Sequence, residues 1–354
     1  RSASSTWLAD EPSVAYAWHA RARLAQQDEH LLGDESSDEE ALGEDGGQAQ
    51  EESGRAARQA LKKEVPWRSI PETDKSRFVA AVKSEWDEWM KWSSCELTSD
   101  IGNIPDNLIL KSRICYRWKP SDASPDGKKA KARIVIAGFR DPHLPLLARD
   151  APVLSRSGFH LLLQWAASRG ATLFNGDCKS AFLQGKADTE RPTPIYMRPP
   201  TDPIGMESVP EWSRKILYKL SAPVYGQANA PRRWFMHVAD TLRGLDWSPH
   251  TLDPCLWMKR DSTGRVIAVL GIHVDDIICC TVPGLEHELE PVRNAFTWGS
   301  EWTDTDFVFV GRRIVQQPDG SITVNQAHYV KEVTLTKTCL LYTSPSPRDL
   351  NPNL

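Results

Sequence analysis

At its most informative point the sequence reads Gly271-Ile272-His273-Val274-Asp275-Asp276-Ile277-Ile278-Cys279-Cys280. Two adjacent carboxylates interrupt a long apolar run, which predicts two buried strands joined by a short turn. Unpaired charges in a buried position would be costly, because each loses its hydration and repels the other. Asp275 and Asp276 are therefore either the exposed polar tip of a turn or carboxylates neutralised by a partner.

Strands and helices alternate on both sides of this hairpin. Apolar runs bounded by turn residues predict strands at 255–258 and 266–270, and a further hairpin through 317–320. Helical spacing predicts helices over 156–169, 231–244 and 284–297, and Pro-rich composition predicts a loop over 190–213. This pattern predicts an alternating α+β fold.

A third carboxylate lies at another predicted strand end. The first of these helices should end at Gly170, after which a strand from Thr172 runs to Asp177. If the fold brings Asp177 to Asp275 and Asp276, the three form a hard-oxygen site of the kind that holds Mg²⁺. Two such ions can catalyse phosphoryl transfer.

A basic hairpin is predicted between 114 and 139. Strand-like runs at 114–118 and 132–139 flank residues 121–127, whose Pro and Asp-Gly are typical of turns. Its cationic residues are Lys111, Arg113, Arg117, Lys119, Lys128, Lys129, Lys131, Arg133 and Arg140. Such a set either protects an exposed sheet edge from aggregation or grips phosphate groups.

An amphipathic helix is predicted from Ser69 onward, within a helical region at 55–110. Trp86 and Trp89 fall on one apolar stripe of this helix, which favours core packing over stacking on bases. Ser69 and Glu72 have the spacing of a capping box.

Composition bounds the class of protein. The 354 residues, 40% of them hydrophobic, suffice for about two domains with a sizeable core. No apolar run reaches about 18 residues and the mean hydropathy is −0.46, so we expect an intracellular protein with no membrane partner. The seven cysteines lack metal-ligand spacing, which favours reduced core residues.

The net charge of −4 is unevenly distributed. Residues 28–54 hold eleven Asp or Glu and no Lys or Arg, so we expect 1–54 to be a disordered acidic linker. Without that stretch the chain has 43 basic and 36 acidic residues. A mildly basic body of this kind permits a polyanionic partner.

Seven short motifs occur in a fixed order along the chain. They are KARIVIAGF at 131–139, APV at 151–153, NGDCKSAFLQG at 175–185, IYMRPP at 195–200, YKL with VYG at 218–226, APRRW at 230–234 and HVDD at 273–276. This order resembles the reverse transcriptase of copia-type retrotransposon Pol polyproteins. The resemblance covers about residues 62–333.

The resemblance implies a right-hand polymerase fold, with fingers and palm in 111–337 and an antiparallel palm sheet backed by helices. It implies DNA synthesis from dNTPs on a primed RNA or DNA template. Asp177, Asp275 and Asp276 would be catalytic and would hold two Mg²⁺ ions, for which Mn²⁺ can substitute. Integrase and RNase H parts of the polyprotein would be partners, and the protein would work in a cytoplasmic particle with nuclear access for integration.

The resemblance also assigns the dNTP site. Arg133, Lys131 and Lys119 would clamp the triphosphate, for which the planar fork of Arg is well suited. Phe182 would be either the aromatic steric gate that excludes a 2′-hydroxyl or a core residue. Further assignments place Gly226 and Gln227 beneath the incoming base, and His273 and Gly311 near the primer and template.

Several departures from the family pattern keep an alternative open. His273 replaces the usual Tyr before VDD, and residues 227–229 replace the usual LKQ. The alternative is a degenerate or co-opted retroelement fragment that binds nucleic acid without polymerising. A third and weaker alternative is a metal-dependent nuclease that uses the same carboxylates. Residues 338–354 resemble translated sequencing adapter, and we expect them to be an artefactual tail.

Overall fold

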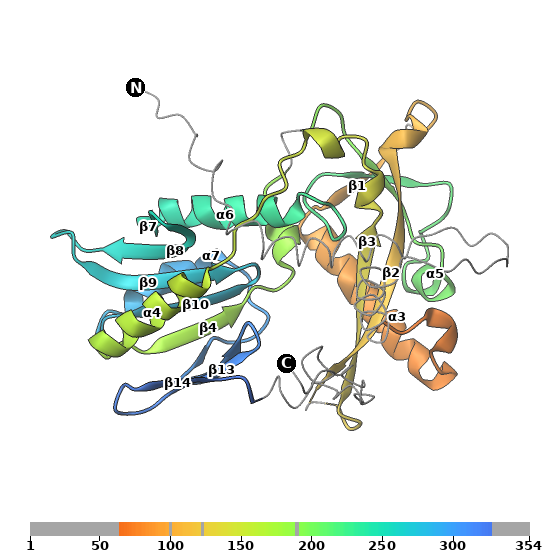
Figure 1. Cartoon of the computed structure of the whole chain (residues 1–354). Coiled ribbons are helices and arrows are strands. Elements are labelled where there is room, and N and C mark those ends of the chain that lie inside the picture. The colour runs from red at the N-terminus through yellow and green to blue at the C-terminus, as the bar shows by residue number, and fades with distance from the viewer. Residues whose placement is uncertain (1–63, 99–100, 122–123, 188–190, 328–354) are drawn as a thin grey trace, which may run out of the picture.

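The computed structural model describes residues 64–98, 101–121, 124–187 and 191–327 (Figure 1). The acidic stretch 1–54 and the tail 338–354 lie outside these residues, and both remain predictions. The described residues form an α+β fold with three sheets, as predicted. None of their helices is long and apolar enough to cross a membrane.

The largest sheet carries the predicted carboxylates. In spatial order its strands are β11 (Thr303–Asp304), β4 (Leu173–Asp177), β10 (Asp276–Thr281), β9 (Val266–His273), β8 (Asp253–Arg260) and β7 (Trp247–His250). Every neighbouring pair is antiparallel. The hairpin around Asp275 is confirmed, because β9 and β10 pair directly across it.

Three helices back this sheet and share its core (Figure 1): α4 (Arg156–Arg169), α6 (Ala230–Gly244) and α7 (Glu290–Ala295). Leu162, Val238 and Val292, one from each helix, are fully buried in this core. The predicted ends of α4 are confirmed. The Ser155 side chain accepts from the backbone N–H of Gly158 at the start, and Gly170 ends the helix with a φ of 61°.

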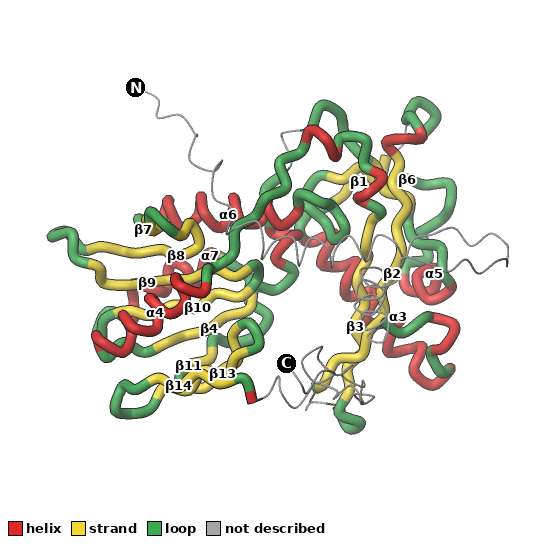
Figure 2. The backbone as a smooth tube through the Cα atoms, in the orientation of Figure 1, coloured by secondary structure: helices red, strands yellow, loops and turns green. Residues whose placement is uncertain are grey.

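A second sheet forms a separate layer (Figure 2), in the order β1 (Cys95–Thr98), β6 (Leu217–Leu220), β5 (Tyr196–Arg198), β2 (Ile109–Pro120) and β3 (Lys128–Ile136). Its pairs are antiparallel except for β2 and β5. Helix α3 (Glu72–Lys91) packs on β3 and on α5 (Pro203–Ser208). Trp86 and Trp89 are buried there, so their assignment to the core is confirmed.

A third, small sheet consists of β12 (Asp306–Phe309), β13 (Arg312–Gln316) and β14 (Ile322–Asn325), which confirms the hairpin through 317–320. Short 3₁₀ turns lie at Trp67–Ser69, Asp106–Leu108, Gly138–Arg140, Leu144–Leu146, Ala181–Gln184 and Glu286–Leu289.

Three local predictions are wrong. The capping box does not form, because the Ser69 hydroxyl donates to the carbonyl of Pro66 and α3 begins after Pro71. The loop predicted over 190–213 contains β5 and α5, and the Asp202 side chain caps α5 at the N–H of Gly205. The helix predicted over 284–297 is a 3₁₀ turn followed by the short α7.

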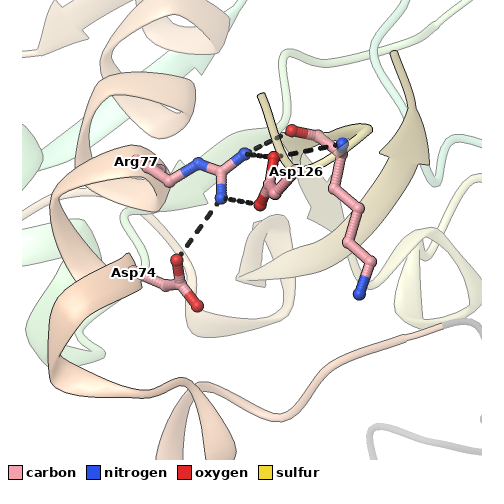
Figure 3. Close-up of polar contacts among 4 residues, drawn as sticks. Asp74, Arg77 and Asp126 are labelled. Atoms are coloured by element: carbon pink, nitrogen blue, oxygen red, sulfur yellow. Dashed lines mark hydrogen bonds and ion pairs between the residues drawn. The ribbon is translucent and has the colours of Figure 1, made fainter. Parts of the chain in front are cut away.

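Arg77 on α3 fastens the tip of the β2–β3 hairpin (Figure 3). Its guanidinium donates two hydrogen bonds to the Asp126 carboxylate, of 2.6 and 3.1 Å, and reaches Asp74 at 3.4 Å. The same group lies 4.6 Å from the centre of the Trp118 ring and donates to the backbone carbonyl of Lys128. A planar fork is required for this set of contacts.

We therefore expect Arg77→Lys to loosen the hairpin tip without unfolding the protein. Amide hydrogens around Asp126 should exchange a few-fold faster, since local openings there need break fewer contacts. Lys75→Gln, which removes another cation from the same helix, is the matched control. Unchanged exchange in Arg77→Lys would show that the clamp does not hold the tip.

Candidate active site

The fold brings the three predicted carboxylates to one end of the largest sheet. Asp177 is the last residue of β4, Asp276 is the first of β10, and Asp275 lies in the turn before it. Asp276 and Asp177 are direct partners in the β10–β4 ladder. Side chains of directly opposed residues leave a sheet on the same face. Residues far apart in the sequence therefore share one corner of the sheet.

Backbone contacts fix this corner. Val274 has a φ of 59°, which is costly for a β-branched residue. The Trp234 indole of α6 donates to the Val274 carbonyl at 2.7 Å, and the carbonyl of Asp275 accepts from the N–H of Cys178 at 2.8 Å. The carbonyl of Asp177 accepts from the N–H of Gly299, also at 2.8 Å. The turn is thus held from both sides in a conformation that it would not adopt alone.

The charges of this corner act on one another. Asp177 keeps contact with solvent, but the protein around it removes part of its hydration, and this loss, followed by repulsion from Asp275, raises its pKa. The positive charges of Lys119, Arg133 and Lys131 oppose the rise. The structure therefore brings two carboxylates close together and places the predicted triphosphate-binding cations within their field.

The buried Cys178 thiol responds to all three carboxylates. Its pKa is raised first by burial and then by the negative charges of Asp177, Asp275 and Asp276. Cys178 is thus kept as a neutral thiol behind the site, as expected of a reduced core cysteine.

The cations come from one face of the β2–β3 hairpin. On β3, Lys131 and Arg133 flank the buried Ala132, so their side chains project from the face opposite to it. Arg117 on β2 pairs with Lys131 and lies on the same face. Burial lowers the pKa of Lys131, and the carboxylate of Glu85 on α3 partly opposes this. The hairpin thus presents its charge on the face away from its core.

Aromatic rings connect this face to the corner. The guanidinium of Arg133 lies 4.7 Å from the centre of the Tyr225 ring, and the ring of Phe182 lies 5.6 Å from that of Tyr225. Phe182 is partly buried and packs against the main core, so both its predicted roles remain open. Burial raises the pKa of Tyr225 to about 12, which keeps its hydroxyl protonated.

The loop with Gly226 and Gln227 packs against the end of β3. A Cβ on Gly226 would lie 2.1 Å from the carbonyl oxygen of Ile136, and one on Gly138 would lie 2.0 Å from the carbonyl oxygen of Gly226. Gln227 is buried, and its side-chain oxygen accepts from the N–H of Val224 at 2.9 Å. In this structure Gln227 thus stabilises its own loop.

His273 and the Gly311 turn are joined by an aromatic contact. The His273 ring lies 6.2 Å edge-on from that of Phe309, which is buried at the end of β12 just before Gly311. Gly311 has a φ of 74° and open space around its missing Cβ. The β12–β13 hairpin therefore lies beside the strand that leads to the carboxylates.

The donor set suits Mg²⁺ but is not a completed cage. Among residues 64–98, 101–121, 124–187 and 191–327, no three acidic, His or Cys side chains are already arranged to hold one ion. Mg²⁺ takes one or two carboxylates and keeps water or substrate oxygens for its other positions. The mutual repulsion of Asp177 and Asp275 is the observation that favours a cation there.

Two supporting residues were missed by sequence reasoning. The Gln184 amide is buried and bonds the carbonyls of Lys179 and Thr297 and the N–H of Thr297, which ties the loop after Asp177 to its neighbour. Glu85 is 4% exposed and lies near Lys131 and Arg133. For Glu85 the available signal was its place beside Val82 and Trp89 on the apolar face of the helix.

One family model and several known proteins match this chain. The family described as "Reverse transcriptase (RNA-dependent DNA polymerase)" matches residues 99–344, well over half of the chain. The Retrovirus-related Pol polyprotein from transposon TNT 1-94 of Nicotiana tabacum is 27% identical over 207 residues, or 58% of this chain. That from transposon RE1 of Arabidopsis thaliana is 24% identical over 216 residues, again 58%. The chain covers 14% of the length of each polyprotein.

Similar solved structures include a foamy viral protease-reverse transcriptase in complex with double-stranded DNA. It is 12% identical, with a TM-score of 0.42, over 95% of this chain and 51% of that one. Telomerase from Candida albicans is 11% identical, with a TM-score of 0.36, over 72% of this chain and 52% of that one.

Proposed function

The chain belongs to the family of reverse transcriptases (RNA-dependent DNA polymerases), and from that premise we propose that it is the RNA-directed DNA polymerase of a copia-type retrotransposon. The observation that carries the proposal is the meeting of Asp177 and Asp275 at the sheet corner, within the field of Lys119, Lys131 and Arg133. Carboxylates beside cations suit a reaction in which metal-bound phosphates are transferred.

We propose that Asp177, Asp275 and Asp276 hold two Mg²⁺ ions, for which Mn²⁺ can substitute. Bound there, the ions would activate the attacking primer 3′-hydroxyl and stabilise the departing pyrophosphate. The chain's own part is to orient the reactants, with Arg133 and Lys131 on the triphosphate and Phe182 beneath the sugar. Positioning and neutralisation of charge supply the rate.

The wider setting is also part of the proposal. The template would be primed RNA or DNA, and integrase and RNase H parts of a polyprotein would act on the same nucleic acid. Synthesis would take place in a cytoplasmic particle, with later access to the nucleus. The names of the relatives, Pol polyproteins from transposons, support the polyprotein part of this setting.

The test is Mg²⁺-dependent extension of a DNA primer on an RNA template by the whole chain. Asp275→Asn/Asp276→Asn is the control, because it keeps the size of both side chains and removes their charge. Extension that the double substitution abolishes would support the proposal. A folded chain that binds primer–template in a salt-sensitive way without extending it would favour the degenerate element instead. Cleavage of unprimed strands would favour a nuclease.

Arg133→Lys tests the proposed triphosphate clamp. Lysine keeps the charge but loses the bidentate fork and the stacking on Tyr225. We expect the KM for dNTP to rise about tenfold, which is the loss of affinity expected when one charge-assisted hydrogen bond is removed. The change in kcat should be smaller. Steady-state extension at varied dNTP concentration measures both, and Arg140→Lys is the matched control. A fall in kcat at constant KM would contradict the assignment.

A further inference from the structure

An ion pair joins the active-site corner to a helix outside the family match. Glu88 of α3 accepts from the ammonium group of Lys179 at 2.5 Å. Lys179 follows Asp177 by two residues, whereas α3 ends before residue 99, where the match to the family begins. A segment that the family match does not include thus contacts the loop that directly follows a proposed metal ligand.

The local backbone directs Lys179 and Asp177 to the same side. Cys178 between them is buried and forms a β-bridge with Trp298, so the chain is extended there and alternate side chains share a side. The Lys179 backbone is fixed by its N–H bond to the Thr297 carbonyl, at 2.9 Å, and by the Gln184 amide. The Lys179 side chain therefore leaves the backbone on the side of Asp177, and its ammonium group pairs with Glu88.

We propose that Glu88 is a positioning residue that holds the Lys179 ammonium away from Asp177 and so leaves that carboxylate free to bind a divalent cation. The proposal rests on the metal-dependent function proposed above. Helix α3 would then contribute to metal binding through Glu88 as well as to the core.

Electrostatics supports this role. An ammonium on Asp177 would repel a divalent cation and occupy one of its ligands, whereas the pair with Glu88 neutralises the ammonium at a distance. The Glu88 side chain is 15% exposed and that of Lys179 is 45% exposed, so solvent screens the pair only in part. Burial alone would raise the pKa of Glu88, but the hydrogen bond and charge of Lys179, with Lys91 and Trp92, hold it below its usual range. Glu88 is therefore ionised at neutral pH.

The experiment measures Mn²⁺ binding to the whole chain in the absence of primer and nucleotide, by the loss of the free-ion electron paramagnetic resonance signal. We expect Glu88→Gln to weaken binding about three- to tenfold at low salt, the effect of one partly screened charge. Glu88→Gln/Lys179→Gln should restore the affinity, because no ammonium then competes. Asp87→Asn is the matched control, since Asp87 lies next in the same helix and pairs with the exposed Lys83.

The outcomes separate this inference from the proposed function. Unchanged Mn²⁺ affinity in Glu88→Gln, or a double variant as weak as the single one, would overturn the inference whether or not the protein polymerises. The single variant Lys179→Gln guards against misfolding of Glu88 variants, because it should bind Mn²⁺ at least as tightly as the wild type. Suppose that the Mn²⁺ affinities of the wild type and the variants follow this pattern, but the wild type extends no primer. That result would uphold the inference and refute the polymerase.

In an active enzyme the same variants have a second readout. Glu88→Gln should raise the Mg²⁺ concentration needed for half-maximal extension three- to tenfold, with the rate at saturating Mg²⁺ and the KM for dNTP little changed. Loss of packing alone would instead lower the rate at every Mg²⁺ concentration, which would contradict the inference.

Discussion

Asp177→Asn is expected to abolish primer extension and at the same time to stabilise the metal-free protein. The loss of activity should be about 10³-fold or more, because a ligand charge that no other residue replaces is removed. The gain in stability follows from the raised pKa of Asp177, whose charge is penalised by lost hydration and by Asp275. Since the group keeps contact with solvent, we expect the gain to be below about 1 kcal/mol.

The pH dependence of this gain has a definite sign. A carboxyl whose pKa is higher in the folded than in the unfolded state binds protons more tightly when folded. Its charge therefore destabilises the fold above the folded-state pKa, and this penalty disappears as the pH falls below the ordinary Asp value of about 3.9. The difference in unfolding free energy between Asp177→Asn and wild type should be largest at neutral pH and vanish in acid.

Urea unfolding in the presence of a metal chelator, at pH 7 and near pH 4, measures this difference. Asp304→Asn is the control, because Asp304 is an exposed carboxylate on β11 in the same sheet and is not a proposed ligand. It should change neither activity nor the pH dependence. Equal or lower stability of Asp177→Asn at pH 7 would contradict the charge repulsion, and retained extension would remove Asp177 from the catalytic set.

Sequence periodicity was sufficient for elements whose ends carry local signals. Helix α4 ends at Gly170 as predicted, and the structure adds a cap at its start from the Ser155 side chain. Helix α5 carried similar signals, Asp202 followed by Pro203, but the surrounding prolines concealed them. The capping box at Ser69 failed because α3 begins after Pro71, which leaves Ser69 outside the helix, where its hydroxyl donates to the carbonyl of Pro66.

The candidate site shows where local reasoning ends. The sequence places Asp177 and Asp275 at strand ends, but their meeting depends on the β10–β4 register, which is set by the packing of the whole sheet. The same holds for Glu88 and Lys179, whose contact joins an amphipathic helix to a distant loop. On the helix alone Glu88 is one acidic residue among several.

Gly138→Ala is expected to lower stability more than any of the substitutions discussed above. The backbones at Gly138 and Gly226 touch, because the end of β3 and the loop after β6 approach without side chains between them. The new Cβ would lie 2.0 Å from the Gly226 carbonyl oxygen and 2.9 Å from its carbon, and both are backbone atoms that cannot rotate away. We expect a loss of about 2–4 kcal/mol in the free energy of unfolding.

Gly226→Ala should destabilise the protein by at least as much, because it combines a 2.1 Å approach to the Ile136 carbonyl oxygen with a φ of 94°, which L-residues rarely adopt. Gly244→Ala is the matched control, since it ends α6 with open space around it and should be neutral or slightly stabilising. Urea unfolding of the three variants measures these effects. Because Tyr225 precedes Gly226 and stacks on Arg133, any folded Gly226→Ala protein should also show a raised KM for dNTP. A Gly138→Ala protein as stable as wild type would mean that the two segments can separate, and the dNTP site would then not depend on their contact.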